Sequence, residues 1–416
     1  MKQVLATGAA LSMALSMTPV TASAADKVDI NVIAAQYGQQ TADWWANFVT
    51  EFNEANPDIN LNVEVVSWND IYTVVNTRIA NGEAPDVLNI DVFADYQADD
   101  LLLPIQDVVS EETYSKMYDA FLAQSEVDGT VWAIPDLASA RAMYYNKDIL
   151  DAAGVEVPTT WDEFEEVLQK LSDAGIQPLT TGGSDKWGAT RLINAYAVRT
   201  AGNDIMTKAA DGEVPYTDEK LVAAADKIAE WAEKGYFGEG ITTVDMNTAG
   251  SMLMSGKAAI FYNGSWFTQN LTDDSQNPAG EDGIGFFNIP VADESISSAT
   301  SYSMNCGNIL ALDNDKYDEA TGWFLKYFME NIGNVAMEDQ GTVKGYTYDV
   351  AADDMDNYTK LVLDEIDKST EGFAWWEAKM PSEISKTAQE NVQPLLNGEM
   401  TGEEYMQSIQ DVYDMQ

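Results

Sequence analysis

The sequence predicts an α/β fold built on a parallel, doubly wound sheet, and three observations support this prediction. Strand-like and helix-like patterns alternate along residues 28–90. The 416 residues, 45% of them hydrophobic, can form a large core that by length divides over two domains. Residues 258–262 form an uncharged apolar run typical of a buried strand, which Asn263-Gly264 ends.

In the first part of the chain, the spacing of hydrophobic residues alternates between a period of 2, typical of strands, and a period of 3.6, typical of helices. Strands are predicted at 28–34, 59–65 and 86–90, with a helix after Thr41 and another after Asp70. Trp45, Phe48 and Phe52 share one face of the first helix, which predicts that they belong to the core. Trp44 lies off this stripe and is free to face a cleft.

Later elements follow the same signals. Strands are predicted at 129–135, 143–146 and 178–181, and loops at 272–283 and 292–303. Thr160 and Glu163 form a capping box that starts a helix ending near Gly175. The remaining predicted helices cover 317–329, 383–396 and 401–412. The first of these offers four core candidates: Trp323, Phe324, Tyr327 and Phe328.

The composition excludes several functions. With 22 Lys and Arg against 69 Asp and Glu, the formal charge is −47, which argues against nucleic-acid and anionic-lipid partners. Anionic small ligands are also disfavoured, unless a local pocket of Arg or Lys overrides the field. The sequence has no His and one Cys, Cys306, so His-based triads and Cys–His pairs are impossible. We expect no catalytic residues, no metal site and no cofactor.

The N-terminus has the pattern of a secretory signal peptide. Lys2 precedes an apolar stretch at 4–17, and Ala22-Ser23-Ala24 is a small-residue cleavage site. We expect cleavage after Ala24 and export of the chain to a periplasm or to the outer cell surface.

Five short motifs carry a resemblance to a known family. They are Phe-Asn-Glu-Ala-Asn-Pro at 52–57, Asn-Gly-Glu-Ala-Pro-Asp-Val at 81–87, Tyr-Asn-Lys-Asp at 145–148 with Pro-Thr-Thr-Trp-Asp-Glu-Phe at 158–164, Gly-Lys-Ala-Ala at 256–259 with Asn-Gly-Ser-Trp at 263–266, and Pro-Leu-Leu-Asn-Gly-Glu-Met-Thr at 394–401. In this order they resemble the extracytoplasmic solute-binding proteins of ABC importers, in the carbohydrate-binding group (family 1) that includes the maltose-binding protein.

The resemblance implies a two-lobe fold with three crossings between lobes and one ligand in the cleft between them. The crossings are expected near 135–141, 300–305 and 345–354. Lobe 1 would comprise 25–137 and 303–348, and lobe 2 would comprise 138–302 and 349–416, after a signal peptide at 1–24. The lobes would close on the ligand by a hinge motion, and the closed monomer would dock on a membrane permease.

The resemblance also suggests binding residues. Trp266 matches a cleft tryptophan that stacks on a sugar ring, and Trp187, Trp375 and Trp376 match further aromatic positions. Polar contacts are expected from strand ends and loops, and the expected residues are Gln36, Tyr37, Asp91 and Asn263. Where the family offers a carboxylate before the strand at 143–146, this sequence has Ser139, and its nearest carboxylate is Asp136.

These residue types suit a neutral mono- or oligosaccharide, because aromatic planes cover the C–H faces of a sugar and Asp, Asn and Gln bind its hydroxyls. Two alternatives remain open. An aromatic cage for a quaternary ammonium compound would draw on the same tryptophans. A glycoside hydrolase would also use aromatic platforms, together with two carboxylates at a set separation.

Overall fold

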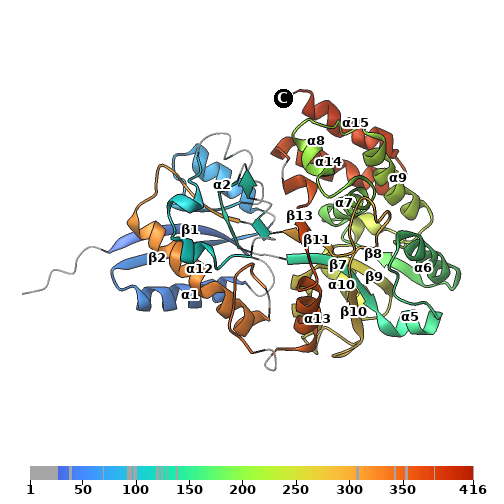
Figure 1. Cartoon of the computed structure of the whole chain (residues 1–416), viewed down its shortest axis with the longest axis horizontal. Helices are drawn as coiled ribbons and strands as arrows, with labels where there is room; N and C mark the ends of the chain where they lie inside the picture. The colour runs from blue at the N-terminus through green and yellow to red at the C-terminus, as the bar shows by residue number, and fades with distance from the viewer. Residues whose placement is uncertain are drawn as a thin grey trace, which may run out of the picture.

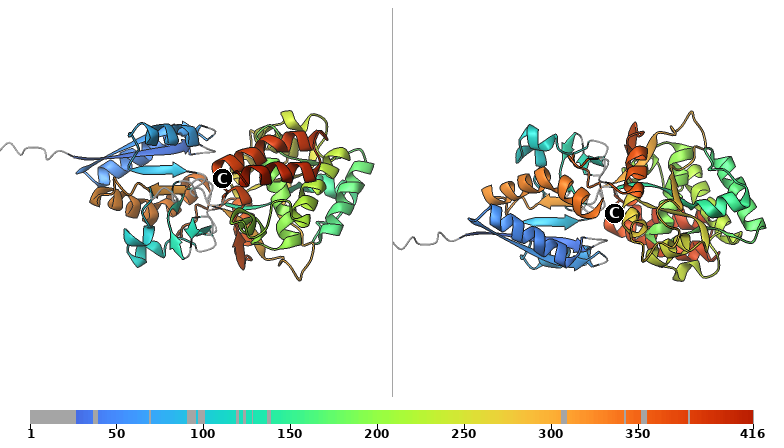
Figure 2. Two further views of the ribbon diagram at one scale, coloured as in Figure 1. Left: turned by 90° about the horizontal axis from the view of Figure 1, so that it is seen from above. Right: turned by 90° about the horizontal axis from the view of Figure 1, so that it is seen from below.

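The chain is organised around two β-sheets, each covered by its own helices (Figure 1). The computed structural model describes residues 27–36, 40–68, 70–90, 96, 101–118, 121–122, 125–127, 129–136, 139–305, 309–341, 343–351, 355–378 and 380–415. The predicted signal peptide lies outside these residues. Two views at right angles to the first show the two lobes end to end (Figure 2).

The first sheet has the strand order β2-β1-β3-β12-β6. Its strands are β1 (Val28–Gln36), β2 (Ile59–Ser67), β3 (Val87–Ile90), β6 (Ile134–Pro135) and β12 (Ile309–Leu312). β1 pairs in parallel with β2 and β3, whereas β12 runs antiparallel to β3 and β6. Because β1, β2, β3 and β6 run in the same direction, their carboxyl ends lie at one edge of this sheet.

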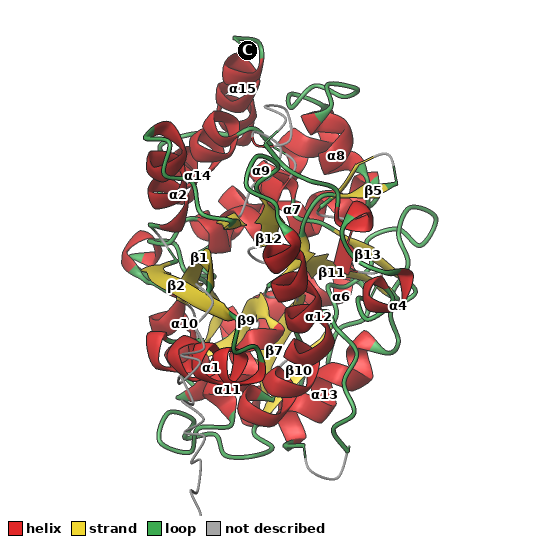
Figure 3. Cartoon of the chain, turned by 90° about the vertical axis from the view of Figure 1, so that its left-hand side faces the viewer, coloured by secondary structure: helices red, strands yellow, loops and turns green. Residues whose placement is uncertain are grey.

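The helices of the first lobe are α1 (Ala42–Ala55), α2 (Ile71–Ala80), α12 (Glu319–Gln340), the short α4 (Glu111–Tyr114) and the 3-10 turn η1 (Ile105–Asp107). A small hairpin, β4 (Glu126–Val127) with β5 (Thr130–Val131), completes it. Trp45, Phe48 and Phe52 are buried in its core, as their spacing predicts. Figure 3 shows α1 and α12 in front of this lobe, with the second lobe behind.

The second sheet has the order β13-β11-β7-β9-β8, and β10 also pairs with β7. Its strands are β7 (Ser139–Asn146), β8 (Gln177–Thr180), β9 (Ala258–Gly264), β10 (Ile284–Phe287), β11 (Ser301–Asn305) and β13 (Glu371–Phe373). β7 is antiparallel to β9, β10 and β11. The parallel arrangement predicted from residues 28–90 therefore fits β2-β1-β3, whereas the centre of the second sheet is antiparallel.

The second lobe carries most of the helices. They are α5 (Lys147–Ala153), α6 (Trp161–Asp173), α7 (Trp187–Ala201), α8 (Ile205–Ala210), α9 (Glu219–Glu233), α10 (Met246–Met254), α11 (Thr268–Leu271), α13 (Asn357–Ile366), α14 (Ser382–Leu396) and α15 (Gly402–Tyr413), with 3-10 turns η3 (Ile241–Thr243), η4 (Ser265–Phe267) and η6 (Trp376–Ala378). None of the described helices is both long and apolar enough to cross a membrane.

The chain passes between the sheets three times. β6 leads into β7, β11 leads into β12, and after α12 the chain returns to β13 in the second sheet. A buried cluster that joins Ile33 and Ile90 of the first sheet to Ala140 and Met304 of the second fills the region of these crossings. The lobe boundaries remain a prediction, and one of them differs from the sheet pairing. The predicted return at residue 303 falls inside β11, which pairs with β7 in the second sheet.

Four sequence predictions differ from the structure in detail. The single strand predicted at 129–135 is two short strands, β5 and β6. The loop predicted at 292–303 ends in β11, whose Tyr302 and Met304 are buried. The helix predicted at 317–329 extends to Gln340. Trp323, predicted as core, is 45% exposed on α12 and donates its indole N–H to Asn56.

Candidate functional site

The edges of the two sheets that face one another are set by the crossings. Two residues separate Asp136, which follows β6, from the start of β7, and three residues separate Asn305 from the start of β12. The carboxyl ends of the parallel strands of the first sheet therefore face the edge of the second sheet where β7 begins and β9 and β11 end (Figure 1). Ligands of open α/β sheets bind at such ends.

Two predicted tryptophans meet at this edge of the second sheet. β8 and β9 are parallel neighbours, so their carboxyl ends lie side by side. Trp187 follows the β8 end and begins α7, and Trp266 follows the β9 end in η4. Their ring centroids are 6.3 Å apart at 61°, and both residues are partly exposed. The topology therefore brings together two residues that are 79 positions apart in the sequence.

The backbone around both rings is tightly constrained. Lys186, just before Trp187, has φ of 65°, the one positive φ among the described non-glycine residues. Strain of this kind often accompanies functional sites. A Cβ atom on Gly264 would lie 2.0 Å from the Trp266 ring, so only glycine allows that ring to fold back over the strand end.

Arg141 lies beside both rings. It is the third residue of β7 and pairs in register with Gly264. Its guanidinium carbon is 5.1 Å from the centroid of Trp187 and 4.7 Å from that of Trp266, a cation–π arrangement. The residue is 5% exposed, and its Nε and Nη1 find no hydrogen-bond partner among the described residues. Burial, with the charge of Arg191 adding to it, lowers the pKa of Arg141 to about 9.

A second arginine lies one turn along α7. Arg191 is buried, forms an ion pair with Glu377 and lies 4.7 Å from the ring centroid of Trp375. The other oxygen of Glu377 accepts a 2.5 Å bond from the Thr190 hydroxyl. Trp375 is 5% exposed, so it supports this ion pair from within the fold and offers little surface to a ligand.

The first lobe contributes a buried polar network at its facing edge. One oxygen of Asp136 accepts a 3.1 Å bond from the Gln40 amide, and the other accepts a 2.8 Å bond from the Asn89 amide. Lys344 donates to the Gln40 side-chain oxygen, and burial lowers the pKa of Lys344 to about 8 although Asp136 opposes the shift. Asp136 is 1% exposed, so its carboxylate organises the crossing and lies beneath the surface.

The structure does not test the ligand-binding role of the other predicted residues. Gln36 is exposed at the end of β1, while Tyr37 and Asp91 lie outside the described residues, as does the side chain of Trp376. Trp44 is half-buried and stacks on Phe48, with ring centroids 5.7 Å apart. Asn263 is 3% exposed, and its side-chain oxygen accepts from the Gly264 backbone N–H. These assignments stay predictions.

Sequence reasoning missed Arg141, Arg191, Gln40 and Lys344. A signal existed for Arg141, since a charged residue interrupts the apolar run of β7 in Ser139–Asn146. Two cavities lie away from Trp187 and Trp266. One of about 890 Å³ lies between α1, β2 and the loop at 83–85, and one of about 510 Å³ lies between Tyr118 and α13.

Residues 37–331 match the model of a family described as bacterial extracellular solute-binding protein. The chain belongs to this family. This family description agrees with the resemblance seen in the sequence. The matches to the first of the similar proteins span about 62% of their length.

The similar proteins are consistent with this family. This chain is 27% identical over 259 residues to a protein of Brucella abortus named as a binding protein, and the match spans 62% of each chain. It is 25% identical over 248 residues to the multiple sugar-binding protein of Streptococcus mutans, spanning 58% of each. A solved chitin oligosaccharide binding protein superposes with a TM-score of 0.83 at 21% identity, covering 94% of this chain and 99% of that one. The two-lobe fold is thereby confirmed.

Proposed function

We propose that this protein binds a mono- or oligosaccharide between its two lobes and delivers it to a membrane ABC permease. The observation that carries the proposal is the pair Trp187 and Trp266 at the edge of the second sheet that faces the first lobe. The C–H faces of a pyranose ring pack well on indole rings, and a fully buried Trp removes roughly 150–250 Å² from water.

Polar groups next to this pair can bind the hydroxyl rim of a sugar. Arg141 has two buried N–H donors without a described partner, and Ser265, beside Trp266, has a buried hydroxyl in the same condition. Unmade hydrogen bonds at buried groups are costly, so a ligand that supplies oxygen acceptors there gains affinity. The relative named as a multiple sugar-binding protein supports the same class of ligand.

The alternatives fit the site less well. A quaternary ammonium ligand at these rings would lie close to the Arg141 cation, and two like charges so close repel each other. A glycoside hydrolase needs a carboxylic acid and a second carboxylate free to act on substrate. The described carboxylates at the site, Glu377 and Asp136, are both engaged by protein donors.

Family membership supports delivery to a permease, and we propose that the ligand-bound lobes close and present a docking surface to it. We propose a monomer that acts in a periplasm or at the outer cell surface, after cleavage behind Ala24. The formal charge of −47 argues against nucleic acid as a partner.

A thermal-shift screen of the chain from Ala25 tests the proposal. Ligand that binds only the folded state stabilises it by about 2.7 kcal/mol at a hundredfold excess over Kd. The panel contains mono- and oligosaccharides, with betaine and glycerol phosphate as outsiders. A shift with one saccharide class supports the proposal, whereas a shift with betaine alone would overturn it.

A further inference from the structure

The three buried arginines among the described residues differ in their hydrogen-bond and ion-pair partners. Arg199 donates to the backbone carbonyls of Ser298, Ile289 and Ser301 at 2.7, 2.8 and 2.9 Å. Arg191 pairs with Glu377. Arg141 is as well buried, yet no hydrogen bond to an oxygen is found for its side chain among the described residues. A buried guanidinium without acceptors is costly, so its retention at a ligand site calls for an external acceptor.

The local charge shows which kind of acceptor fits. Arg141 and Arg191 are close enough for the charge of one to lower the pKa of the other. Glu377 is the carboxylate that acts on them, and it already forms an ion pair with Arg191. Counted over the described residues, the cluster of Arg141, Arg191 and Glu377 therefore carries one positive charge in excess, which a neutral hydroxyl would leave uncompensated. An anionic oxygen group would neutralise it.

The geometry also favours an anion. A guanidinium presents its N–H donors in a fixed fork that matches two oxygens of a carboxylate or a sulfate. The guanidinium carbon lies over the rings of both Trp187 and Trp266, which limits the freedom of the group to turn away. α7 also begins at Trp187 without a side-chain cap, and the N-terminal end of a helix carries partial positive charge.

From these observations we propose that the ligand is an acidic saccharide, whose carboxylate or sulfate ester binds Arg141 while a sugar ring packs on Trp187 and Trp266. This inference rests on the proposed saccharide function and revises the neutral ligand that the sequence favoured. The overall charge of −47 disfavours anions at long range, but a buried arginine at the binding site overrides that field locally.

Matched ligand pairs test the inference on the unmodified protein by calorimetry. One pair is digalacturonic acid and its methyl ester, and the other is a sulfated galactose disaccharide and its desulfated form. We expect the anionic member of one pair to bind at least about tenfold more tightly. Which pair shows the difference distinguishes carboxylate from sulfate. Equal or tighter binding of both neutral members overturns the inference and leaves the proposed function standing. If no saccharide of the wider panel binds, the proposed function itself is overturned.

Variants then assign the effect to one residue. Arg141→Gln should abolish the preference for the anionic member, and Arg141→Lys should retain part of it, because lysine keeps the charge and loses the fork. Arg78→Gln removes an exposed arginine of the first lobe and is the matched control, with an unchanged preference. If Arg141→Gln keeps the full preference, Arg141 is not the anion-binding residue. The unmodified protein still decides the ligand class if a variant fails to fold.

Discussion

At the residue scale, the site depends on which side chains share a face at the strand ends. Trp266 reaches Arg141 because Gly264 leaves room for its ring, and Gly264 lies opposite Arg141 in the β7–β9 pair. Trp187 joins them because β8 lies beside β9. Each of these contacts involves residues far apart in the sequence, and each would be lost with one substitution.

Trp266→Ala should weaken saccharide binding by roughly 2–4 kcal/mol, since it removes a central aromatic surface and leaves Arg141 without one of its two rings. Isothermal titration calorimetry with the saccharide found in the screen measures the change. Trp323→Ala removes an exposed tryptophan of the first lobe and should leave the affinity unaltered. An unchanged Kd for Trp266→Ala would exclude the ring from the binding surface.

Lys344 should make stability depend on pH in alkaline solution. Its folded-state pKa of about 8 is below the ordinary value of 10.5, so the folded protein bears the cost of the buried charge below pH 8. As pH rises from 8 to 10.5 the folded state loses this proton first, and the free energy of unfolding rises by up to about 3 kcal/mol from this group.

Urea denaturation of the unmodified protein and of Lys344→Gln across this pH range measures the effect as a difference. The tyrosines titrate in both proteins, so their contribution cancels. Lys386→Gln, which alters an exposed lysine, is the matched control. A constant difference between the unmodified protein and Lys344→Gln would contradict a charged, buried Lys344.

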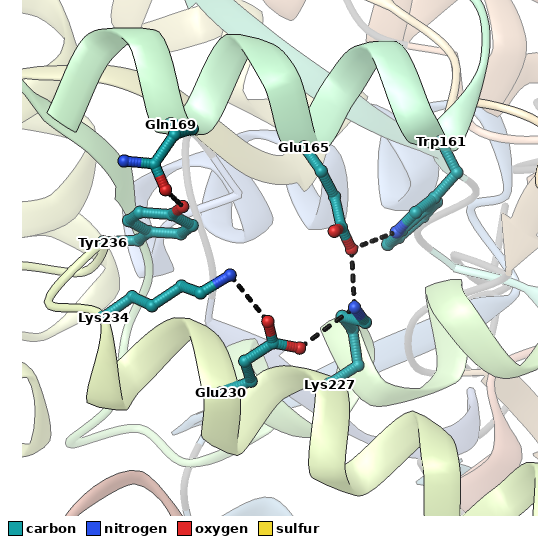
Figure 4. A network of polar contacts seen from close by, with 7 residues as sticks. All are labelled: Trp161, Glu165, Gln169, Lys227, Glu230, Lys234 and Tyr236. Carbon is teal, nitrogen blue, oxygen red and sulfur yellow. Dashed lines mark hydrogen bonds and ion pairs between the residues drawn. The ribbon is translucent and has the colours of Figure 1, made fainter. Parts of the chain in front are cut away.

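At the element scale, α6 and α9 are joined by a polar network (Figure 4). Trp161 of this network also stacks on Trp231 of α9. Lys227 of α9 binds Glu165 of α6 at 2.7 Å and Glu230 at 3.0 Å. The Trp161 indole donates to Glu165 at 3.2 Å. The capping box predicted at Thr160 and Glu163 is present and fixes where α6 begins, which sets the register of this network.

Lys227→Met should lower the free energy of unfolding by about 1 kcal/mol, because it leaves two carboxylates facing each other without a cation. Chemical denaturation at pH 7 measures the loss, and Lys220→Met, an exposed position on the same helix, is the control. Bonds from Lys234 and Lys227 lower the pKa of Glu230. The contribution is therefore present above the ordinary Glu value of 4.5 and is lost as pH falls through the lowered pKa. An equal loss at neutral and acid pH would contradict this account.

Elements whose hydrophobic pattern is local were predicted well, and elements that depend on partners were not. β1 has the hydrophobic pattern of a strand within its own residues, and α1 and α6 have both a helical pattern and capping residues. The loop predicted at 292–303 from its Asp, Glu and Ser content overlaps the first three residues of β11, and pairing with β7 and β13 makes Ser301–Asn305 a strand. Trp323 fits the apolar stripe of α12 by sequence, but it faces solvent.

At the scale of the whole molecule, acidity is a source of internal repulsion. A formal charge of −47 on 416 residues disfavours the compact state, and salt screens this repulsion with a Debye length of about 10 Å at 0.1 M and about 3 Å at 1 M. The melting temperature of the unliganded protein should therefore rise as NaCl increases from 10 mM to 0.5 M.

Differential scanning fluorimetry measures this rise. KCl at the same ionic strength should give the same curve, because screening depends on ionic strength and not on the identity of a monovalent cation. A melting temperature that is flat or that falls with salt would show that the acidic surface does not limit stability.

The sequence by itself determined the α/β class, the family resemblance, the core face of α1, the caps of α6 and the presence of tryptophans after β8 and β9. These features depend on residue type and on short-range periodicity, which are written locally in the chain. The tertiary structure alone decided that Trp187 and Trp266 meet, that Arg141 lies beside both, and that Asp136 and Trp375 are buried inside the fold. Strand order and the interlobe crossings set those contacts, because they bring together residues that no local pattern connects.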